Sequence, residues 1–181
     1  MSRLIGWAVD VPEVVVFDSR RAAQVGGELA RHGIAFERRP PGPGLRDLDD
    51  EAIFAANAHA VDEMRRASGF VSIDIARLHE DTPATRELRG RFLEEHVHED
   101  DEVRWILDGA GVFWLRMDGR VFALCCEAGD VVSIPAGTPH AFDAVTLPMT
   151  AMRFFRVPGG WTARPTGRAL AQVFPIPEEV R

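Results

Sequence analysis

Apolar and polar residues alternate along most of the second half of the chain, at intervals typical of short β-strands. The run at 70–78 shows the pattern, with Val71, Ile73 and Ile75 on one face. The dipeptide Asp118-Gly119, between two apolar runs, is typical of a tight hairpin turn. Further strands are expected at residues 93–98, 102–107, 111–117, 120–126, 130–134, 140–145 and 149–157. Many short strands separated by turn signals predict a sandwich or a barrel.

The N-terminal half mixes short strands with helices. Residues 7–9, 14–17 and 34–38 fit short strands, whereas residues 20–32 and 49–67 have apolar side chains at helical spacing. Thr82 and Pro83 begin a short helix that ends near Phe92, because a capping threonine followed by proline suits a first turn. We therefore expect a mainly β protein with α additions, in which the N-terminal helices pack outside a barrel.

The chain is expected to form one domain over residues 1–181. Its one linker-like segment, the proline- and glycine-rich residues 40–44, is too short to separate two domains. We expect residues 1–92 to supply strands and helices that flank the barrel. Residues 93–157 should form the barrel core with the functional site, and residues 158–181 a C-terminal coil with one helical turn near Ala169.

Composition argues against several classes of function. The net charge of −7, without a basic patch, argues against a nucleic-acid partner. The N-terminus lacks the apolar run of a signal peptide, and no apolar segment approaches the ~20 residues that cross a bilayer. Cys125 and Cys126 are neighbours on opposite faces of a strand and form no disulfide framework. We expect a cytoplasmic protein, and a monomer because no amphipathic dimerisation element is evident.

The chemistry concentrates in residues 95–102, with the sequence Glu-His-Val-His-Glu-Asp-Asp-Glu. Side chains alternate along a strand, so His96 and His98 point the same way, and Glu102 opens the next strand. Two imidazoles and one carboxylate suit a divalent transition metal with open positions. His140, after a turn with two prolines at 135–139, is a fourth candidate ligand. The alternative interpretation is surface charge together with ordinary core histidines.

The phase of the strands brings arginines toward the same interior. If Glu102 faces a metal, so does Arg104, and an arginine inside a barrel is costly unless it meets an anion. The alternative is that Arg104 is paired with a structural carboxylate. In the last strand Arg153 shares a face with Met149 and Phe155, but its phase is not fixed, so a site role and a surface salt bridge both stay open.

Two spacings resemble the paired motifs of the cupin superfamily. The first is Gly90-x5-His96-x-His98-x3-Glu102-x6-Gly109, and the second is Gly129-x5-Pro135-x-Gly137-x2-His140. The resemblance implies a double-stranded β-helix, the small jelly-roll barrel, with four ligands facing inward near one mouth. Where the second motif commonly ends in Asn, this chain has Ala144.

A narrower resemblance is to the acireductone dioxygenase family of methionine salvage, in its bacterial branch. It rests on Glu95-His96-Val97-His98, Asp101-Glu102-Val103-Arg104 and residues 134–140, and extends to residues 33–38 and 159–161. The resemblance implies that the metal is held by His96, His98, Glu102 and His140. It implies substrate contacts from Arg104 and Arg153, and an aromatic pocket of Phe92, Phe142 and Trp161. Phe92 and Trp161 could equally be ordinary core aromatics.

The same resemblance implies the reaction. Molecular oxygen would cleave the acireductone 1,2-dihydroxy-5-(methylthio)pent-1-en-3-one. With Fe²⁺ the expected products are formate and 4-methylthio-2-oxobutanoate, and with Ni²⁺ they are formate, carbon monoxide and 3-methylthiopropanoate. One metal ion per chain is expected. The alternatives are another metal-dependent cupin dioxygenase and a non-catalytic cupin that binds a small ligand.

Overall fold

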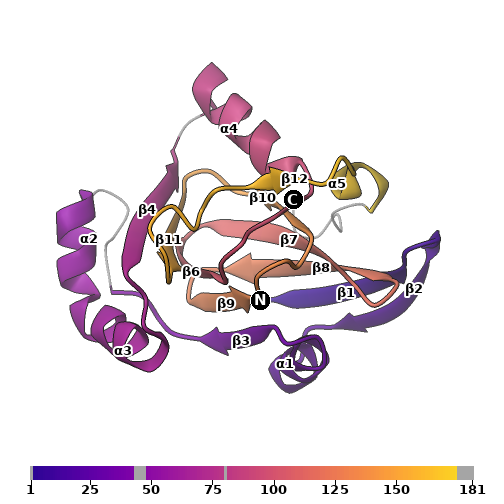
Figure 1. Cartoon of the computed structure of the whole chain (residues 1–181), viewed down its shortest axis with the longest axis horizontal. Helices are drawn as coiled ribbons and strands as arrows, with labels where there is room; N and C mark the ends of the chain where they lie inside the picture. Colours follow the sequence, from indigo (N-terminus) through magenta and orange to yellow (C-terminus); the bar gives the residue numbers. More distant parts are fainter. Residues whose placement is uncertain (1, 43–47, 80, 175–181) are drawn as a thin grey trace.

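Two antiparallel sheets make up the body of the protein in the computed structural model, which describes residues 2–42, 48–79 and 81–174 (Figure 1). The larger sheet has the order β12-β5-β10-β7-β8-β1-β2. Its strands are β1 (Arg3–Ala8), β2 (Val11–Ser19), β5 (His96–Val97), β7 (Ala110–Met117), β8 (Arg120–Glu127), β10 (His140–Ala144) and β12 (Arg164–Pro165). The smaller sheet has the order β3-β9-β6-β11-β4. Its strands are β3 (Ala35–Arg38), β4 (Ser72–Leu78), β6 (Glu102–Asp108), β9 (Asp130–Ile134) and β11 (Met149–Phe155).

The alternation of side chains along the strands separates an inner core from an outer one. Phe113 of the larger sheet and Ile106 of the smaller sheet belong to one buried cluster, so the two sheets pack face to face. Trp105, the neighbour of Ile106, belongs to a second cluster together with Ile53 and Met64 from helices. Because Ile106 and Trp105 lie on opposite faces of β6 and are both buried, this strand is buried on both faces. The predicted mainly β barrel with helices outside is confirmed.

Helices cover the outside of the barrel. They are α1 (Ala22–Ala30), α2 (Asp50–Ala56), α3 (Ala58–Ser68), α4 (Pro83–Leu93) and α5 (Leu170–Val173). The single helix expected over 49–67 is wrong, because the chain breaks at Asn57. The Asn57 side chain donates to the Ile53 carbonyl (2.9 Å) and accepts from the Gly42 backbone (2.9 Å), which ends α2. In the described parts of the chain, no helix has the length and apolar character needed to cross a membrane.

The N-terminal strands, which were expected to flank the barrel, are hydrogen-bonded into its two sheets. β1 pairs with β8 along its whole length, β3 pairs with β9, and β4 pairs with β11. The physical reason is that strands β8, β9 and β11 would otherwise expose unpaired backbone groups at sheet edges. The barrel therefore extends beyond residues 93–157.

The segment around the first two histidines is less regular than expected. Instead of a strand over 93–98, α4 continues to Leu93 and β5 has only His96 and Val97. The C-terminal segment, expected as coil, supplies β12, which pairs Arg164 with Val97. The short helix α5 lies close to the helical turn expected near Ala169, and residues 175–181 of the expected coil lie outside the described residues.

We expect Gly111→Ala to destabilise the protein. A Cβ atom at this position would lie 2.4 Å from Cζ of Phe142 and 3.0 Å from the Asp143 carbonyl, so β10 would have to shift. Overpacking of this kind costs about 1–3 kcal/mol, measurable as a lower midpoint of urea unfolding. Gly27→Ala is the matched control: nothing lies within 4 Å of its Cβ, and alanine in helix α1 should stabilise by about 0.5–1 kcal/mol. Equal effects at the two positions would contradict this account of Phe142 packing.

Candidate metal centre

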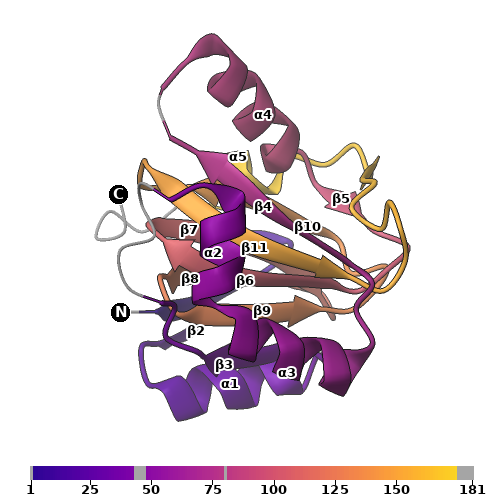
Figure 2. The ribbon, with the colours of Figure 1, turned by 90° about the vertical axis from the view of Figure 1, so that its left-hand side faces the viewer.

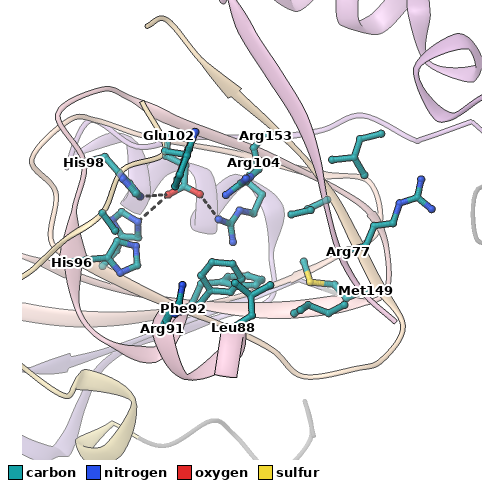
Figure 3. A pocket seen from close by; sticks show the side chains of 18 of the residues that line it. Arg77, Leu88, Arg91, Phe92, His96, His98, Glu102, Arg104, Met149 and Arg153 are labelled. Atoms are coloured by element: carbon teal, nitrogen blue, oxygen red, sulfur yellow. Dashed lines mark hydrogen bonds and ion pairs between the residues drawn. The ribbon is translucent and has the colours of Figure 1, made fainter. Parts of the chain in front are cut away.

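Four buried side chains converge inside the barrel at one end of the larger sheet (Figure 3). His96 lies on β5, His98 follows that strand, Glu102 begins β6 and His140 begins β10. One ligand atom from each residue lies within 4.8 Å of those of the others. The strand register explains part of this convergence, because His140 is paired directly with His96. Residues far apart in the chain thus form one cluster.

Each imidazole is oriented by a backbone carbonyl. The Nδ1 atom of His96 lies 2.7 Å from the Glu94 oxygen, that of His140 lies 2.8 Å from the Thr138 oxygen, and that of His98 lies 3.1 Å from the Thr162 oxygen. A carbonyl only accepts, so each Nδ1 carries the proton and donates it. In a neutral imidazole protonated on Nδ1, the Nε2 atom has the lone pair and is the nitrogen that can bind a metal, as is common among metal-binding histidines.

Burial and charge fix the protonation of the cluster. Burial alone would raise the pKa of Glu102, but Arg104 and the hydrogen bonds with His140 and His98 outweigh it and hold that pKa well below its ordinary value. Burial, with the neighbouring His140, lowers the pKa of His96 to about 4. An ionised carboxylate and a neutral imidazole are the forms that bind metal ions.

The donor set fits a divalent transition metal. Imidazole nitrogens and a carboxylate oxygen suit iron, nickel or zinc, whereas a cluster of oxygens alone would suit magnesium or calcium. In the structure the Glu102 Oε2 atom lies 2.9 Å from Nε2 of His140 and 3.2 Å from Nε2 of His98. Four protein ligands would leave two positions of an octahedral metal open to a substrate.

The neighbouring acidic residues have other partners. Glu95 accepts two hydrogen bonds from Arg116 (2.7 and 2.9 Å), Asp100 accepts from the Arg156 and Val157 backbone, and Asp101 accepts from the Ala136 backbone. These carboxylates hold loops together around the cluster and are not among the four converging ligand residues.

A cavity of about 500 Å³ opens beside the cluster. All nine residues singled out from the sequence line it: His96, His98, Glu102, His140, Arg104, Arg153, Phe92, Phe142 and Trp161. Apolar residues that the sequence did not predict in this wall include Ile75, Leu78 and Leu88. Their positions depend on the pairing of β4 with β11 and on the packing of α4, for which the sequence has no local signal. Trp161 is 53 % exposed and lies at the rim.

Arg104 lies between the ligand cluster and the aromatic wall. It forms an ion pair with Glu102, so the carboxylate partner considered in the sequence analysis is present. Its Cζ atom lies 4.4 Å from the ring centroid of Phe142 and 5.1 Å from that of Phe113, within the range of cation–π attraction. Its Nε atom is buried without a hydrogen-bond partner. A buried donor without a partner is costly, so this atom is suited to an oxygen of a bound ligand.

Arg153 both forms a salt bridge and lines the cavity, which are the two roles left open by the sequence. Its Nε and Nη2 atoms donate to both carboxylate oxygens of Asp74, at 2.7 and 2.8 Å. Arg153 also lines the cavity, and the strand register places it beside Arg104. The bidentate ion pair fixes the guanidinium at the cavity wall.

The protonation of this cluster predicts how the metal-free protein responds to acid. The pKa of His96 falls from 6.5 to about 4 on folding, so its stabilising contribution is complete above pH 6.5 and is lost as the pH falls toward 4. The loss is about 3 kcal/mol in the free energy of unfolding, measured by urea unfolding of metal-free protein at several pH values. His59→Ala, at a fully solvated position, should leave the profile unchanged, whereas His96→Ala should flatten it. A flat profile in the unmodified protein would contradict the buried neutral imidazole.

Known proteins resemble this chain in sequence and structure. A sequence model of the ARD/ARD′ family matches residues 46–163. The acireductone dioxygenase of Parvibaculum lavamentivorans is 41% identical over 91% of this chain and 90% of its own. That of Frankia alni is 41% identical over 97% of this chain and 88% of its own. The solved acireductone dioxygenase from Bacillus anthracis, with a cadmium ion in its active centre, superposes with a TM-score of 0.77 at 26% identity and covers 91% of this chain and 98% of its own.

These matches span nearly the whole chain rather than the motif residues alone. They include the N-terminal strands and α4, which contribute to the sheets and to the cavity wall. The sequence resemblance is thereby confirmed, and the chain belongs to the acireductone dioxygenase family.

Proposed function

We propose that this chain is an acireductone dioxygenase that binds one Fe²⁺ or Ni²⁺ ion and uses molecular oxygen to cleave 1,2-dihydroxy-5-(methylthio)pent-1-en-3-one. The observation that carries the proposal is the convergence of three oriented imidazoles and one carboxylate within 4.8 Å, at the wall of the cavity. Relatives that match almost end to end have this name. His96, His98, Glu102 and His140 are the proposed metal ligands.

The metal, when bound, supplies positive charge that favours deprotonation of the substrate enediol. The protein contributes the orientation of the ligands, since the backbone carbonyls fix which imidazole nitrogen faces inward. It also contributes a site largely closed to water, because all four ligands are buried. Electrostatic interactions are stronger in such surroundings than in water.

Arg104 is the proposed catalytic arginine. Its unpartnered Nε atom and its fixed position against the rings of Phe142 and Phe113 provide a donor in place before substrate binds. A donor directed at an oxygen that gains negative charge stabilises the transition state without reorganisation. Arg153, fixed by Asp74, would add a second positive charge at the same wall.

The apolar part of the cavity is the proposed site for the methylthio tail. Phe92 and Phe142 form its aromatic side, and Met149 lies farther from the ligand cluster (Figure 3). Trp161 would close the rim. All of these residues come from one chain, so the site is complete without a second copy, and we propose that the protein acts as a monomer.

The direct test is to supply the acireductone under air to protein reconstituted with iron or with nickel. Oxygen uptake and loss of the enediol absorbance should occur with both metals. Carbon monoxide is expected only with nickel, and 4-methylthio-2-oxobutanoate with iron. Turnover of a different small diol but not of this acireductone would favour another cupin dioxygenase. Bound metal without any oxygen uptake would favour a non-catalytic binding protein.

We expect His96→Ala to weaken metal retention at least 100-fold. The variant removes one of four ligands, and even changes in the residues that orient ligands typically cost 10–100-fold in metal affinity. Metal content after dialysis against a chelator is the measurement. His59→Ala is the matched control, because His59 is an exposed histidine on α3. Full metal retention by His96→Ala would contradict its place as a ligand.

We expect Arg104→Ala to keep its metal and lose turnover. Removing one preorganised donor to a developing oxyanion costs about 10²–10³ in kcat. Arg104→Lys keeps the charge but not the planar guanidinium, so it should restore only part of the rate. Metal content and kcat are measured on the same preparations. An Arg104→Ala protein with unaltered kcat would refute the proposed role.

A further inference from the structure

We infer that Arg89 is a positioning residue for substrate: its ion pair with Asp143 holds helix α4 against the barrel and so fixes Leu88 and Phe92 as one wall of the cavity. The inference rests on the proposed function for its kinetic readout. The anchoring of α4 by this pair can also be tested without any substrate. A residue outside the cavity thereby determines how tightly the apolar tail is bound.

Helix α4 is weakly anchored by apolar contacts. None of its residues is buried, and Figure 2 shows its N-terminal end projecting away from the two sheets. Leu88 is 37 % exposed, although it lines the cavity. Phe92, four residues later on the same face, packs edge-on against Phe142 with ring centroids 6.5 Å apart. A helix with so little buried surface has a low free energy of local opening.

Within the part of the chain that the structure describes, one side-chain ion pair ties this helix to the barrel. Arg89 donates from Nε and Nη2 to the two carboxylate oxygens of Asp143, at 2.8 and 2.9 Å. Among the described residues, the other α4 arginines bond locally: Arg86 to Asp81 just before the helix, and Arg91 to Glu87 within it. The bidentate pair is partly buried, with the Asp143 side chain 11 % exposed. Such a pair fixes direction as well as distance.

Asp143 connects the helix to the strand that builds the site. It lies on β10, next to Phe142 and three residues after His140. Side chains alternate along the strand, so Phe142 faces the cavity while Asp143 faces outward toward α4. Asp143, on the outer face of β10, therefore holds helix α4 in place. Leu88 and Phe92 of this helix line the cavity on the inner side of the same strand. Loss of the ion pair should loosen this wall without touching the metal ligands.

The kinetic test compares Arg89→Gln with Arg86→Gln, a matched control on the same helix whose pair with Asp81 is exposed. We expect KM for the methylthio acireductone to rise about fivefold in Arg89→Gln, with kcat within twofold of the unmodified enzyme. For an analogue with a shortened apolar tail the rise in KM should be smaller, because this analogue makes fewer contacts with the loosened wall. The KM of Arg89→Lys should lie between those of the unmodified enzyme and Arg89→Gln. The KM of Asp143→Asn should match that of Arg89→Gln.

The structural test is hydrogen–deuterium exchange of residues 83–93 in the same variants without substrate. Exchange should be faster in Arg89→Gln and Asp143→Asn and unchanged in Arg86→Gln. Unchanged exchange, or an unchanged KM in an active enzyme, would overturn the inference, as would a fall in kcat alone. If the unmodified protein has no dioxygenase activity, the proposed function fails, and the exchange comparison still decides whether Arg89 anchors α4.

Discussion

The burial of one carboxylate governs how the interior of this protein is arranged. Glu102 is 2 % exposed, and transferring an isolated carboxylate from water to an apolar interior is costly. Positive charge and hydrogen-bond donors must therefore surround it. Arg104 supplies the first, and the imidazoles of His98 and His140 lie at hydrogen-bond distance. A divalent cation among three neutral imidazoles and this carboxylate would have a net charge of about +1, which an anionic enediolate would complement. Stability and chemistry thus depend on the same buried charge.

The two-sheet barrel places these groups with little conformational freedom. The ligand segments β5 and β10 are neighbours in one sheet, whereas Glu102 comes from the other, so the cluster bridges the barrel at one end. Alternation along each strand then assigns its two faces. On β6 it directs Arg104 into the cavity and Trp105 into the outer core beneath the helices. On β10 it directs Phe142 inward and Asp143 toward α4. The alternation of side chains along the strands therefore both forms the site and places Asp143 where it binds helix α4.

The residues of the site could be predicted from the sequence because their signals are local. The spacing of His96, His98 and Glu102 sets their faces at two strands that follow one another along the chain, and the turn before His140 is marked by prolines. Long-range contacts have no such signal. The pairing of β1 with β8, the break between α2 and α3 at Asn57, and the partner Asp74 of Arg153 all depend on residues distant in sequence. The two-residue strand β12 was missed because it lies in the expected C-terminal coil and pairs with β5, which is distant in sequence.

X-ray absorption spectroscopy of the protein loaded with nickel or iron tests the central claim most directly. The account predicts one metal ion per chain, surrounded by three imidazole nitrogens and one carboxylate oxygen, with the remaining positions taken by water or other exchangeable oxygen ligands. The imidazole scattering should decrease by about one third in His140→Ala, since one of three rings is lost. A spectrum of loaded protein without imidazole scattering, or one identical in His140→Ala, would contradict the account.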